Sequence, residues 1–303
     1  MDEMSELIIE THELSKRFGR KLALDGLTLS LPRGGVHAVI GSNGAGKSTL
    51  FRVLLGFLSP TSGTSTILGE DSRALTPRTR GRIGLVHEEH TLPGWMTVRG
   101  LKEMQRSVYP RWREATYGQV LGHFQVLSEQ RISQLSRGER AGVNLALALA
   151  QGPEVLILDE PTLGLDVVAK QSFLESLLFA GEGEDCTVIY CSHQMDEIER
   201  VADNLIILER GSLVSMAPPE EFCGRVSGWV VDWTSPPPEV HAIPGFLQAR
   251  DVDGQQQLMV LDQDEGFSEC LESLGAGSVL RLPVGLNQAV NAYLTRNHTS
   301  PST

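Results

Sequence analysis

A glycine-rich run near the N-terminus has the spacing of a phosphate-binding loop. The run matches G-x-x-x-x-G-K-[ST], in which glycines let backbone N–H groups close around phosphate oxygens. Lys47 is expected to reach the β and γ phosphates of a nucleoside triphosphate, and Ser48 to place its hydroxyl on Mg²⁺. The positive end of the following helix dipole adds to the field that holds the anion. The predicted phosphate-binding residues are Gly41, Ser42, Asn43, Gly44, Ala45, Gly46, Lys47, Ser48 and Thr49.

A second element of this chemistry is an apolar run that ends in two carboxylates. Val155 to Leu158 reads as a buried strand and is followed by Asp159 and Glu160. Ligands of open α/β sheets bind at the carboxyl ends of the strands, which is where both acids would lie. Alone, the pair could be two solvated charges. Beside a phosphate loop, we expect Asp159 to hold Mg²⁺ through its water shell and Glu160 to polarise the water that attacks the γ-phosphate.

A third motif separates this chain from other proteins with a phosphate loop. Leu135 to Arg140 opens an apolar helix and resembles the LSGGQ signature of ATP-binding cassette proteins. Ser136 and Gly138 are retained, whereas Arg137 stands in place of a glycine and Glu139 in place of the glutamine. The resemblance implies that Ser136, Gly138 and Glu139 meet the γ-phosphate of an ATP bound on the opposite subunit. By itself, Ser136 could simply be a helix N-cap without a ligand.

The resemblance to ATP-binding cassettes covers about Leu7 to Phe222 and assigns four further positions. Phe18 lies where the family stacks an aromatic ring on adenine, although it could also be a core aromatic. Asp166 ends a stretch like the family's D-loop, and His193 matches the switch histidine that reads the γ-phosphate. Glu88 falls where the family has the Q-loop glutamine, so we expect it near the water and Mg²⁺, with an added negative charge.

The elements that must position these residues follow an α/β pattern. Apolar runs alternate with helical segments, which favours a mostly parallel sheet. We therefore expect a P-loop NTPase core of the ATP-binding cassette type over residues 1–225, with a β-rich N-terminal part and an inserted helical subdomain at about 97–151. Predicted strands include 27–31, 36–40, 155–158, 187–191 and 205–208, with a helix beginning near Gly46.

The pattern of predicted strands and helices changes after Phe222. Predicted strands at 229–233, 257–261 and 279–282 and helices at 267–274 and 286–294 indicate a small α+β domain over residues 226–303, with a frayed tail at 297–303. This part offers no clustered ligands and no nucleophile with a base. Stabilisation of a dimer or regulation is the expected role.

Composition limits the remaining classes of function. The formal net charge of −12 opposes binding to nucleic acid, and no apolar run approaches the ~18 residues that cross a bilayer. Met1 to Glu10 carries acidic residues where a secretory signal is basic, so we expect a cytoplasmic protein. The four cysteines lie apart and indicate neither zinc nor a disulfide framework.

The resemblance implies that ATP and Mg²⁺ are the cofactors and that ATP hydrolysis powers transport. One chain holds one phosphate loop and one signature, so two cassettes, expected to be a homodimer, would close head to tail around ATP. A separate integral membrane permease would dock near His87 to Val98 and hold the protein at the inner face of the membrane. The signature helix and the C-terminal extension resemble the free-standing ATPase subunits of bacterial exporters. The alternatives are a soluble mechanical ATPase and a small-molecule kinase, and the kinase would leave the signature and His193 unexplained.

Overall fold

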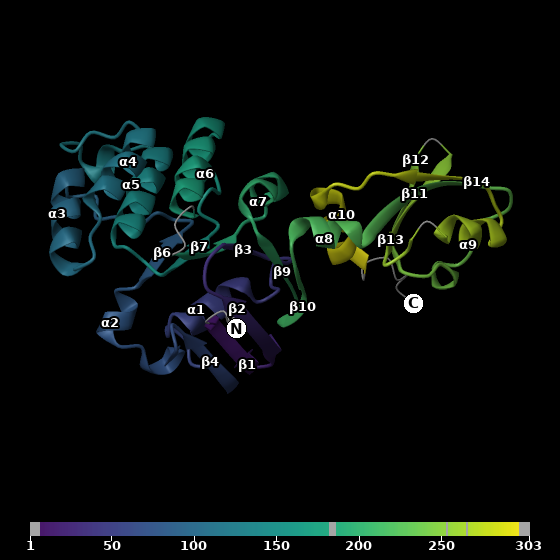
Figure 1. The fold of residues 1–303 in the computed structure, drawn as a ribbon, viewed down its shortest axis with the longest axis horizontal. Coiled ribbons are helices and arrows are strands. Elements are labelled where there is room, and N and C mark those ends of the chain that lie inside the picture. The colour runs from purple at the N-terminus through teal and green to yellow at the C-terminus, as the bar shows by residue number, and fades with distance from the viewer. Residues whose placement is uncertain (1–6, 182–185, 253, 265, 297–303) are drawn as a thin grey trace, which may run out of the picture. The chain divides into compact units, whose positions relative to one another are not determined.

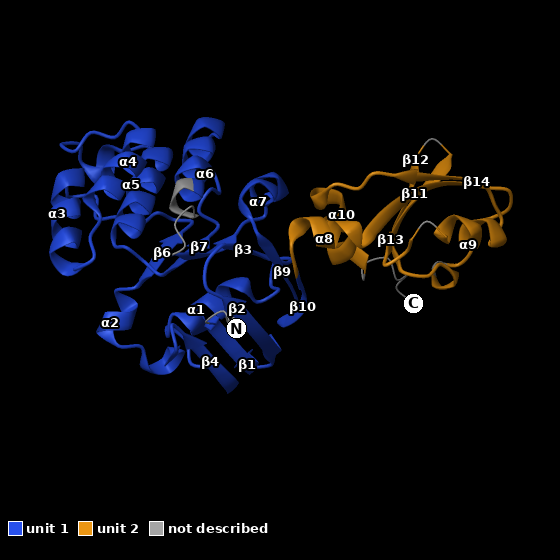
Figure 2. Ribbon diagram, in the orientation of Figure 1, with its two compact units in different colours: residues 1–216 blue, residues 217–303 orange. Residues whose placement is uncertain are grey.

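The chain folds into two compact units, which a computed structural model describes over residues 7–181, 186–252, 254–264 and 266–296. The first unit ends at Met216 and the second begins at Ala217 (Figure 2). The second unit therefore starts before the expected boundary at residue 225. The reason is helix α8 (Pro219–Gly224), whose buried Phe222 packs edge-on against Tyr293 with ring centroids 5.6 Å apart. The expected frayed tail, 297–303, lies outside the described residues.

The N-terminal part of the first unit is an antiparallel sheet in the order β2-β1-β4-β5. Buried and exposed side chains alternate along much of β2, as in a sheet with one covered face. The bounds are β1 (Leu7–Phe18), β2 (Lys21–Pro32), β4 (Ser62–Ile67) and β5 (Glu70–Asp71).

A second sheet forms the centre of this unit, in the order β10-β9-β3-β8-β7-β6. Its inner pairs β9/β3, β3/β8, β8/β7 and β7/β6 are all parallel, and β3 and β8 are buried throughout. Parallel strands place their carboxyl ends at one edge, as the sequence analysis required. The strands are β3 (Val36–Ile40), β6 (Ile83–His87), β7 (Val155–Asp159), β8 (Thr187–Cys191), β9 (Asn204–Glu209) and β10 (Ser212–Ala217).

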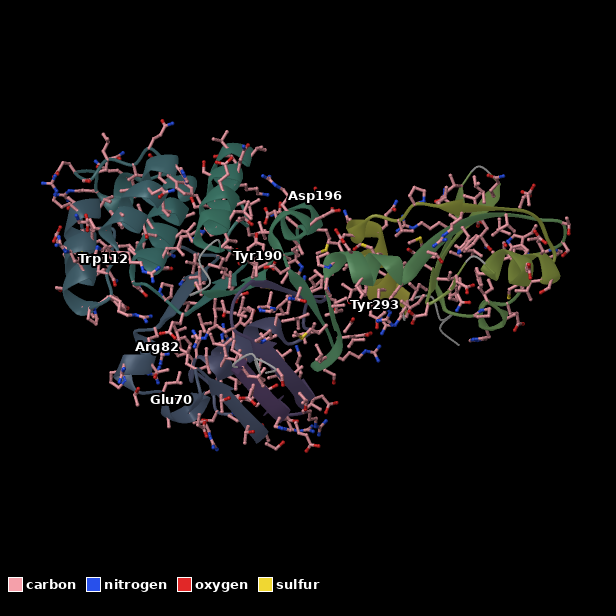
Figure 3. The ribbon with its side chains drawn as sticks, viewed as in Figure 1. Glu70, Arg82, Trp112, Tyr190, Asp196 and Tyr293 are labelled. Carbon is pink, nitrogen blue, oxygen red and sulfur yellow. The ribbon has the colours of Figure 1, made fainter. Side chains whose placement is uncertain are left out.

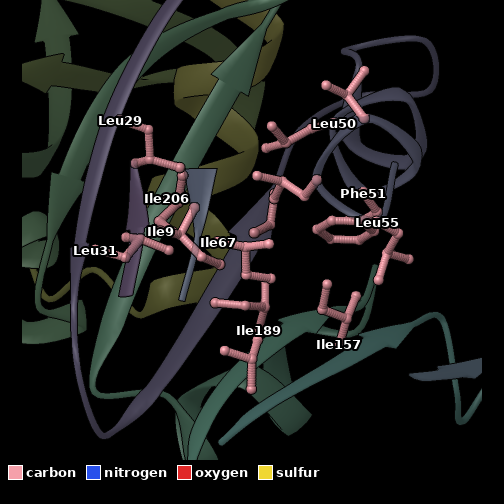
Figure 4. Close-up of a cluster of buried hydrophobic side chains, with 14 of the residues drawn as sticks. Ile9, Leu29, Leu31, Leu50, Phe51, Leu55, Ile67, Ile157, Ile189 and Ile206 are labelled. Carbon is pink, nitrogen blue, oxygen red and sulfur yellow. The ribbon is translucent and has the colours of Figure 1, made fainter. Parts of the chain in front are cut away.

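Helix α1 (Lys47–Leu54) and the two sheets enclose the main hydrophobic core. Leu50 and Phe51 of α1 meet Ile157 and Ile189 of the parallel sheet on one side, and β1 and β2 side chains on the other (Figure 4). These side chains are almost wholly removed from water, which fixes the start of α1 against the sheet edge. Three more helices belong to this unit, namely α2 (Pro77–Arg80), α6 (Val167–Gly181) and α7 (Met195–Val201).

A helical subdomain lies between β6 and β7 in the chain (Figure 1). Thr97 caps α3 by accepting from the Gly100 N–H at 3.1 Å, and the helix ends at Val108 with Tyr109 as its C-cap. Its elements are α3 (Val98–Val108), α4 (Glu114–His123), the short 3₁₀ turn η2 (Ile132–Gln134) and α5 (Arg137–Ala150). Helix α5 is the most buried of them and packs against α4 and α6.

One carboxylate ties this subdomain to the parallel sheet. Glu154, immediately before β7, is contacted by the guanidinium groups of Arg82 at 2.6 Å, Arg111 at 2.7 Å and Arg33 at 3.1 Å. Arg82, labelled in Figure 3, precedes β6, whereas Arg111 lies between α3 and α4. The hydrogen bonds from Arg82 are the largest cause that lowers the pKa of Glu154 to about 2.

The second unit is an antiparallel sheet in the order β12-β13-β11-β14, and its described residues also form α8, α9 and α10. Its core gathers Trp229 and Val231 of β11, Leu258 of β13 and Phe267 and Leu271 of α9. Strand β12, with its mixed polar sequence, was not predicted. The bounds are β11 (Val226–Trp233), β12 (Phe246–Val252), β13 (Gln255–Leu261), β14 (Ala276–Leu282), η3 (Val240–Ala242), α9 (Phe267–Ser273) and α10 (Leu286–Thr295). Across the described part of the chain, every helix is too short or too polar to traverse a bilayer.

Candidate functional site

The glycine-rich run forms a loop between β3 and α1, with Lys47 as the first residue of the helix. Gly46, the N-cap, has φ 108°, and a Cβ there would lie 2.6 Å from the Ala23 carbonyl oxygen. Only glycine fits that position without moving the backbone. The Lys47 side chain is buried, and its Nζ donates to the carbonyl oxygen of Gly41 at 2.6 Å and of Ser42 at 3.4 Å. The ammonium is therefore held inside the curve of the loop.

A cavity of about 420 Å³ opens in front of this loop at the carboxyl edge of the parallel sheet. It brings the loop together with the acids after β7, the histidine after β8 and Glu88 after β6. Its lining residues are Lys21, Ala23, Asn43, Gly44, Ala45, Gly46, Lys47, Ser48, Thr49, Glu88, Asp159, Glu160, Leu163 and His193. Five segments distant in sequence thus converge on a volume suited to a small polar ligand.

Glu160 and His193 form the closest polar contact in this cavity. His193 Nε2 lies 3.2 Å from Glu160 Oε1, and the His193 backbone N–H donates to Glu160 Oε2 at 3.3 Å. The backbone N–H of Glu160 donates to the Cys191 carbonyl oxygen at 3.0 Å, and the residue adopts the left-handed φ of 50°. Such a backbone is uncommon for a residue with a Cβ and is found often at functional sites.

Burial raises the pKa of the Glu160 carboxyl, against the opposing effects of His193 and Lys47. A carboxylate with a raised pKa is a better proton acceptor near neutral pH than a fully solvated one. Asp159, in register with His87 on one side and Cys191 on the other, lies at the same strand end. The two acids therefore occupy different environments although they are neighbours in sequence.

A buried hydrogen-bond cluster underlies this pair. Glu197 Oε2 accepts from the hydroxyls of Tyr190 at 2.5 Å, Thr162 at 2.7 Å and Ser192 at 3.1 Å. Thr162 lies two residues after Glu160 and Ser192 immediately precedes His193, so one carboxylate fixes the loops after β7 and β8. Burial and the nearby Glu197 carboxylate raise the pKa of Tyr190, labelled in Figure 3. Glu197 was not predicted from the sequence; its position four residues after His193, in the short helix α7 that follows this histidine, was the available signal.

The signature residues lie at the start of α5. Ser136 and Glu139 form a capping box, in which Ser136 Oγ accepts from the Glu139 N–H at 3.2 Å and Glu139 Oε2 accepts from the Ser136 N–H at 2.7 Å. Gly138 is buried against Ala169, whose Cβ would lie 2.7 Å from an added Cβ. Among the described residues that line the cavity, none of these three occurs.

Phe18 and Asp166 are also outside the cavity lining. Phe18 is 46% exposed at the end of β1, which excludes the alternative that it is a core aromatic, and Lys16 Nζ lies 5.2 Å from its ring centroid. Asp166 Oδ1 accepts from the Ala169 N–H at 2.9 Å in the first turn of α6. Its carboxylate therefore stabilises that helix start in this structure.

Three lining residues were not anticipated. Lys21 and Ala23 come from the beginning of β2, and Leu163 follows the Glu160 loop. The turn Gly19–Arg20 reverses the chain after Phe18, but the sequence contains no signal that β2 would return beside the phosphate loop. Lys21 adds a second positive charge to a site that already contains Lys47.

The oxygen atoms present fit a magnesium ion that is held jointly with a nucleotide. The Ser48 hydroxyl and the carboxylates of Asp159 and Glu88 line the same cavity. Within the described residues, no group of three or more histidine, cysteine, aspartate or glutamate side chains could hold a metal alone. Mg²⁺ commonly takes one or two carboxylates and completes its shell with phosphate oxygens and water.

Comparisons with known proteins agree with this geometry. The family model described as ABC transporter matches residues 24–163. A "Nod factor export ATP-binding protein I" from Rhizobium sp. (strain N33) is 34% identical over 83% of this chain and 85% of its own length. The protein of the same name from Burkholderia orbicola (strain AU 1054) is 31% identical over 93% and 95%. A solved "Structure of ATP binding subunit of ABC transporter" superposes with a TM-score of 0.64 and 25% identity, over 71% of this chain and 91% of the other.

Proposed function

The chain belongs to the ABC transporter family of ATP-binding proteins and is an ATPase that powers transport, and from this premise we propose that it drives an exporter by closing a dimer of cassettes around ATP. The observation that carries the proposal is the cavity in which Lys47, Asp159, Glu160 and His193 converge. ATP is the ligand of the family, and its phosphates match the positive, backbone-rich side of this cavity.

Each residue has a role that follows from its position. Lys47 pairs with the β and γ phosphates, while Asn43 to Thr49 supply backbone N–H groups and the Ser48 hydroxyl. Bound Mg²⁺, held by Ser48, Asp159 and Glu88, would neutralise charge on the phosphates. Glu160 accepts a proton from the attacking water, because its pKa is raised and its carboxylate faces the cavity. His193, 3.2 Å from that carboxylate, holds it in place and meets the γ-phosphate.

The signature supports a site completed by a second subunit. Ser136 presents a helix N-terminus, yet it is not among the described residues that line the cavity of its own chain. We propose that two copies of this chain pair head to tail, so that Ser136, Gly138, Glu139 and Asp166 of one copy meet the nucleotide on Lys47 of the other. ATP then favours the closed dimer and hydrolysis favours opening, which is a shift of population between two states. Phe18, exposed at the end of β1, is proposed to stack on adenine.

We propose that the transmembrane pathway belongs to a separate permease chain. The relatives named above are ATP-binding proteins for export, which supports an export direction. Trp95, 78% exposed in the stretch between His87 and Val98, is available for docking. This tryptophan therefore lies outside the core of the helical subdomain. The docked protein would lie at the inner face of the membrane.

Affinity purification from detergent-solubilised membranes tests this function directly. Export coupling predicts that the full-length chain co-purifies with a polytopic membrane protein and that vesicles containing both couple ATP hydrolysis to substrate movement. Co-sedimentation with ribosomes or DNA, without a membrane partner, would instead support a soluble mechanical ATPase. The acidic composition of the chain opposes that second outcome.

A further inference from the structure

Two of the three substitutions that set this cassette apart, at positions 88 and 137, contact each other in the fold. Glu88 and Arg137 replace a glutamine and a glycine of the family pattern and lie 49 positions apart. Arg137 Nη2 nevertheless lies 3.8 Å from Glu88 Oε1 and donates to the Glu88 carbonyl oxygen at 3.4 Å. A negative and a positive charge, each unexpected on its own, are therefore partners.

The Arg137 side chain is placed by packing as well as by charge. An added Cβ on Gly164 would lie 2.9 Å from the Arg137 Cζ and 3.0 Å from Nη1, so the guanidinium lies directly against the Gly164 backbone. Any larger residue at position 164 would displace it. One side chain of the signature thus contacts both the loop after β6 and the loop after β7.

The charge balance of the cavity explains why Glu88 needs a partner. Glu88, Asp159 and Glu160 all line it, while Lys21 and Lys47 are its cations. A third carboxylate facing the phosphates of a nucleotide repels them, and the repulsion is strongest where the site is partly removed from water. A cation in contact with that carboxylate opposes this repulsion.

We propose that Arg137 is a positioning residue that pairs with Glu88 and offsets the negative charge that this carboxylate, as a ligand of Mg²⁺, adds beside the phosphates. Glu88 and Arg137 then act as one unit that restores the charge balance a glutamine would give. This inference rests on the proposed function, because it requires the cavity to take MgATP. The side chains of Glu88 and Arg137 are 49% and 45% exposed. We therefore expect their ion pair to change the affinity for the ligand more than the free energy of unfolding.

A double-mutant cycle on the full-length chain tests the coupling. Glu88→Gln keeps the size of the side chain while removing its charge. Arg137→Gln removes the charge and shortens the side chain, but glutamine and arginine have similar helix propensities. The readout is the Kd for MgATP by calorimetry. We expect Arg137→Gln to raise Kd by about 3- to 10-fold, Glu88→Gln to lower it, and the double variant to recover most of the loss.

Salt provides a readout that a purely structural defect would not alter. The ratio of the Kd of Arg137→Gln to that of the parent should shrink when salt is raised from about 0.1 M to about 1 M, because exposed charges are screened. Arg99→Gln is the matched control: Arg99 is an exposed arginine of the same subdomain, paired with Glu129. It should leave the Kd unchanged.

The outcomes separate this inference from the proposed function. If Arg137→Gln binds MgATP like the parent, or if the double variant binds as weakly as Arg137→Gln, the coupling is refuted. If Lys47→Ala also retains full affinity, the nucleotide site itself is wrong. If Lys47→Ala loses MgATP binding while the effects of Glu88→Gln and Arg137→Gln on Kd are additive, the nucleotide site stands and only the coupling between Glu88 and Arg137 is refuted.

Discussion

The imidazole of His193 lies against the carboxylate of Glu160, with Nε2 3.2 Å from Oε1, while the His193 backbone N–H donates to the other carboxylate oxygen. Both oxygens of the acid are therefore oriented by one residue of the next strand end. A base held in this way loses little freedom when it accepts a proton.

Replacement of Glu160 should separate binding from hydrolysis. Glu160→Gln keeps the shape of the side chain and one acceptor oxygen but cannot accept the proton, so we expect hydrolysis to fall by about 10²- to 10⁴-fold with nearly unchanged ATP affinity. The same variant should accumulate a closed dimer with ATP on size exclusion. Phosphate release and calorimetry measure the two effects. Parental turnover would remove Glu160 from the mechanism.

Lys47→Ala should reduce nucleotide affinity. The change deletes the buried ammonium that lies within the loop, and a charge-assisted contact of this type corresponds to roughly 10- to 100-fold in Kd. Lys102→Ala, on α3 and outside the cavity lining, is the control and should bind ATP normally. Equal affinities for both variants by calorimetry would contradict the phosphate-loop assignment.

Two changes at Ser136 distinguish its role as a cap from a role in a shared site. Ser136→Arg should preserve ATP binding by the monomer but abolish cooperative hydrolysis, because it blocks the partner's γ-phosphate. Ser136→Asp keeps a good N-cap and adds a negative charge, so it should also block hydrolysis while the helix stays stable. ATP turnover measured as a function of protein concentration distinguishes the two roles. Full activity in Ser136→Asp would leave only the capping role.

Removal of Glu197 should destabilise the cassette. Glu197→Ala leaves three buried hydroxyls without their acceptor, and we expect a loss of about 2 to 4 kcal/mol in the free energy of unfolding. Glu197→Gln retains an oxygen acceptor and should lose less. Urea unfolding followed by circular dichroism measures both. The exposed Glu199→Ala is the control, and an equal loss there would argue against the cluster.

The buried His90 predicts a pH dependence of stability. Its Nε2 lies 2.8 Å from the Pro161 carbonyl oxygen, and burial lowers its pKa from 6.5 to about 4. Arg137, His87 and Arg140 act in the same direction, and Asn144 is its other polar neighbour. The unfolded chain thus binds a proton that the folded chain does not as pH falls below 6.5. We expect this stabilisation, about 3 kcal/mol, to be complete above pH 6.5 and lost by pH 4.

A variant without this imidazole isolates the effect. His90→Gln should be less stable at pH 7.5, yet its free energy of unfolding should fall less between pH 6.5 and pH 4 than that of the parent. Contributions from Glu154 cancel in this comparison, because both proteins retain it. Parallel curves for the two proteins would contradict a neutral, buried His90.

The ends of the strands could be predicted well from the sequence because each predicted site residue there follows a run of apolar residues. Asp159 and Glu160 follow a wholly buried strand, and the phosphate loop follows another, so the order of motifs nearly determined which side chains would converge. The same logic explains why the expected nucleotide-binding core and the inserted helices agree with the fold.

Other features depend on contacts that no local pattern contains. Lys21 reaches the cavity only because β2 returns beside the loop, and the pairing of Glu88 with Arg137 depends on how α5 sits against the sheet. The second unit begins at Ala217 because Phe222 packs on Tyr293, a contact between residues 71 positions apart in sequence. The mixed polar pattern of β12 is typical of an edge strand and gave little signal.

The three arginines on Glu154 have a mechanical consequence for the helical subdomain. Any displacement that separated Arg111 from Glu154 would expose a carboxylate that is now almost enclosed by positive charge. Reorientation of α3, α4 and α5 is therefore least costly as a rotation about this point. We expect the end of the subdomain near Ser136 to move most in such a rotation, while the end near Arg111 stays close to the rotation axis.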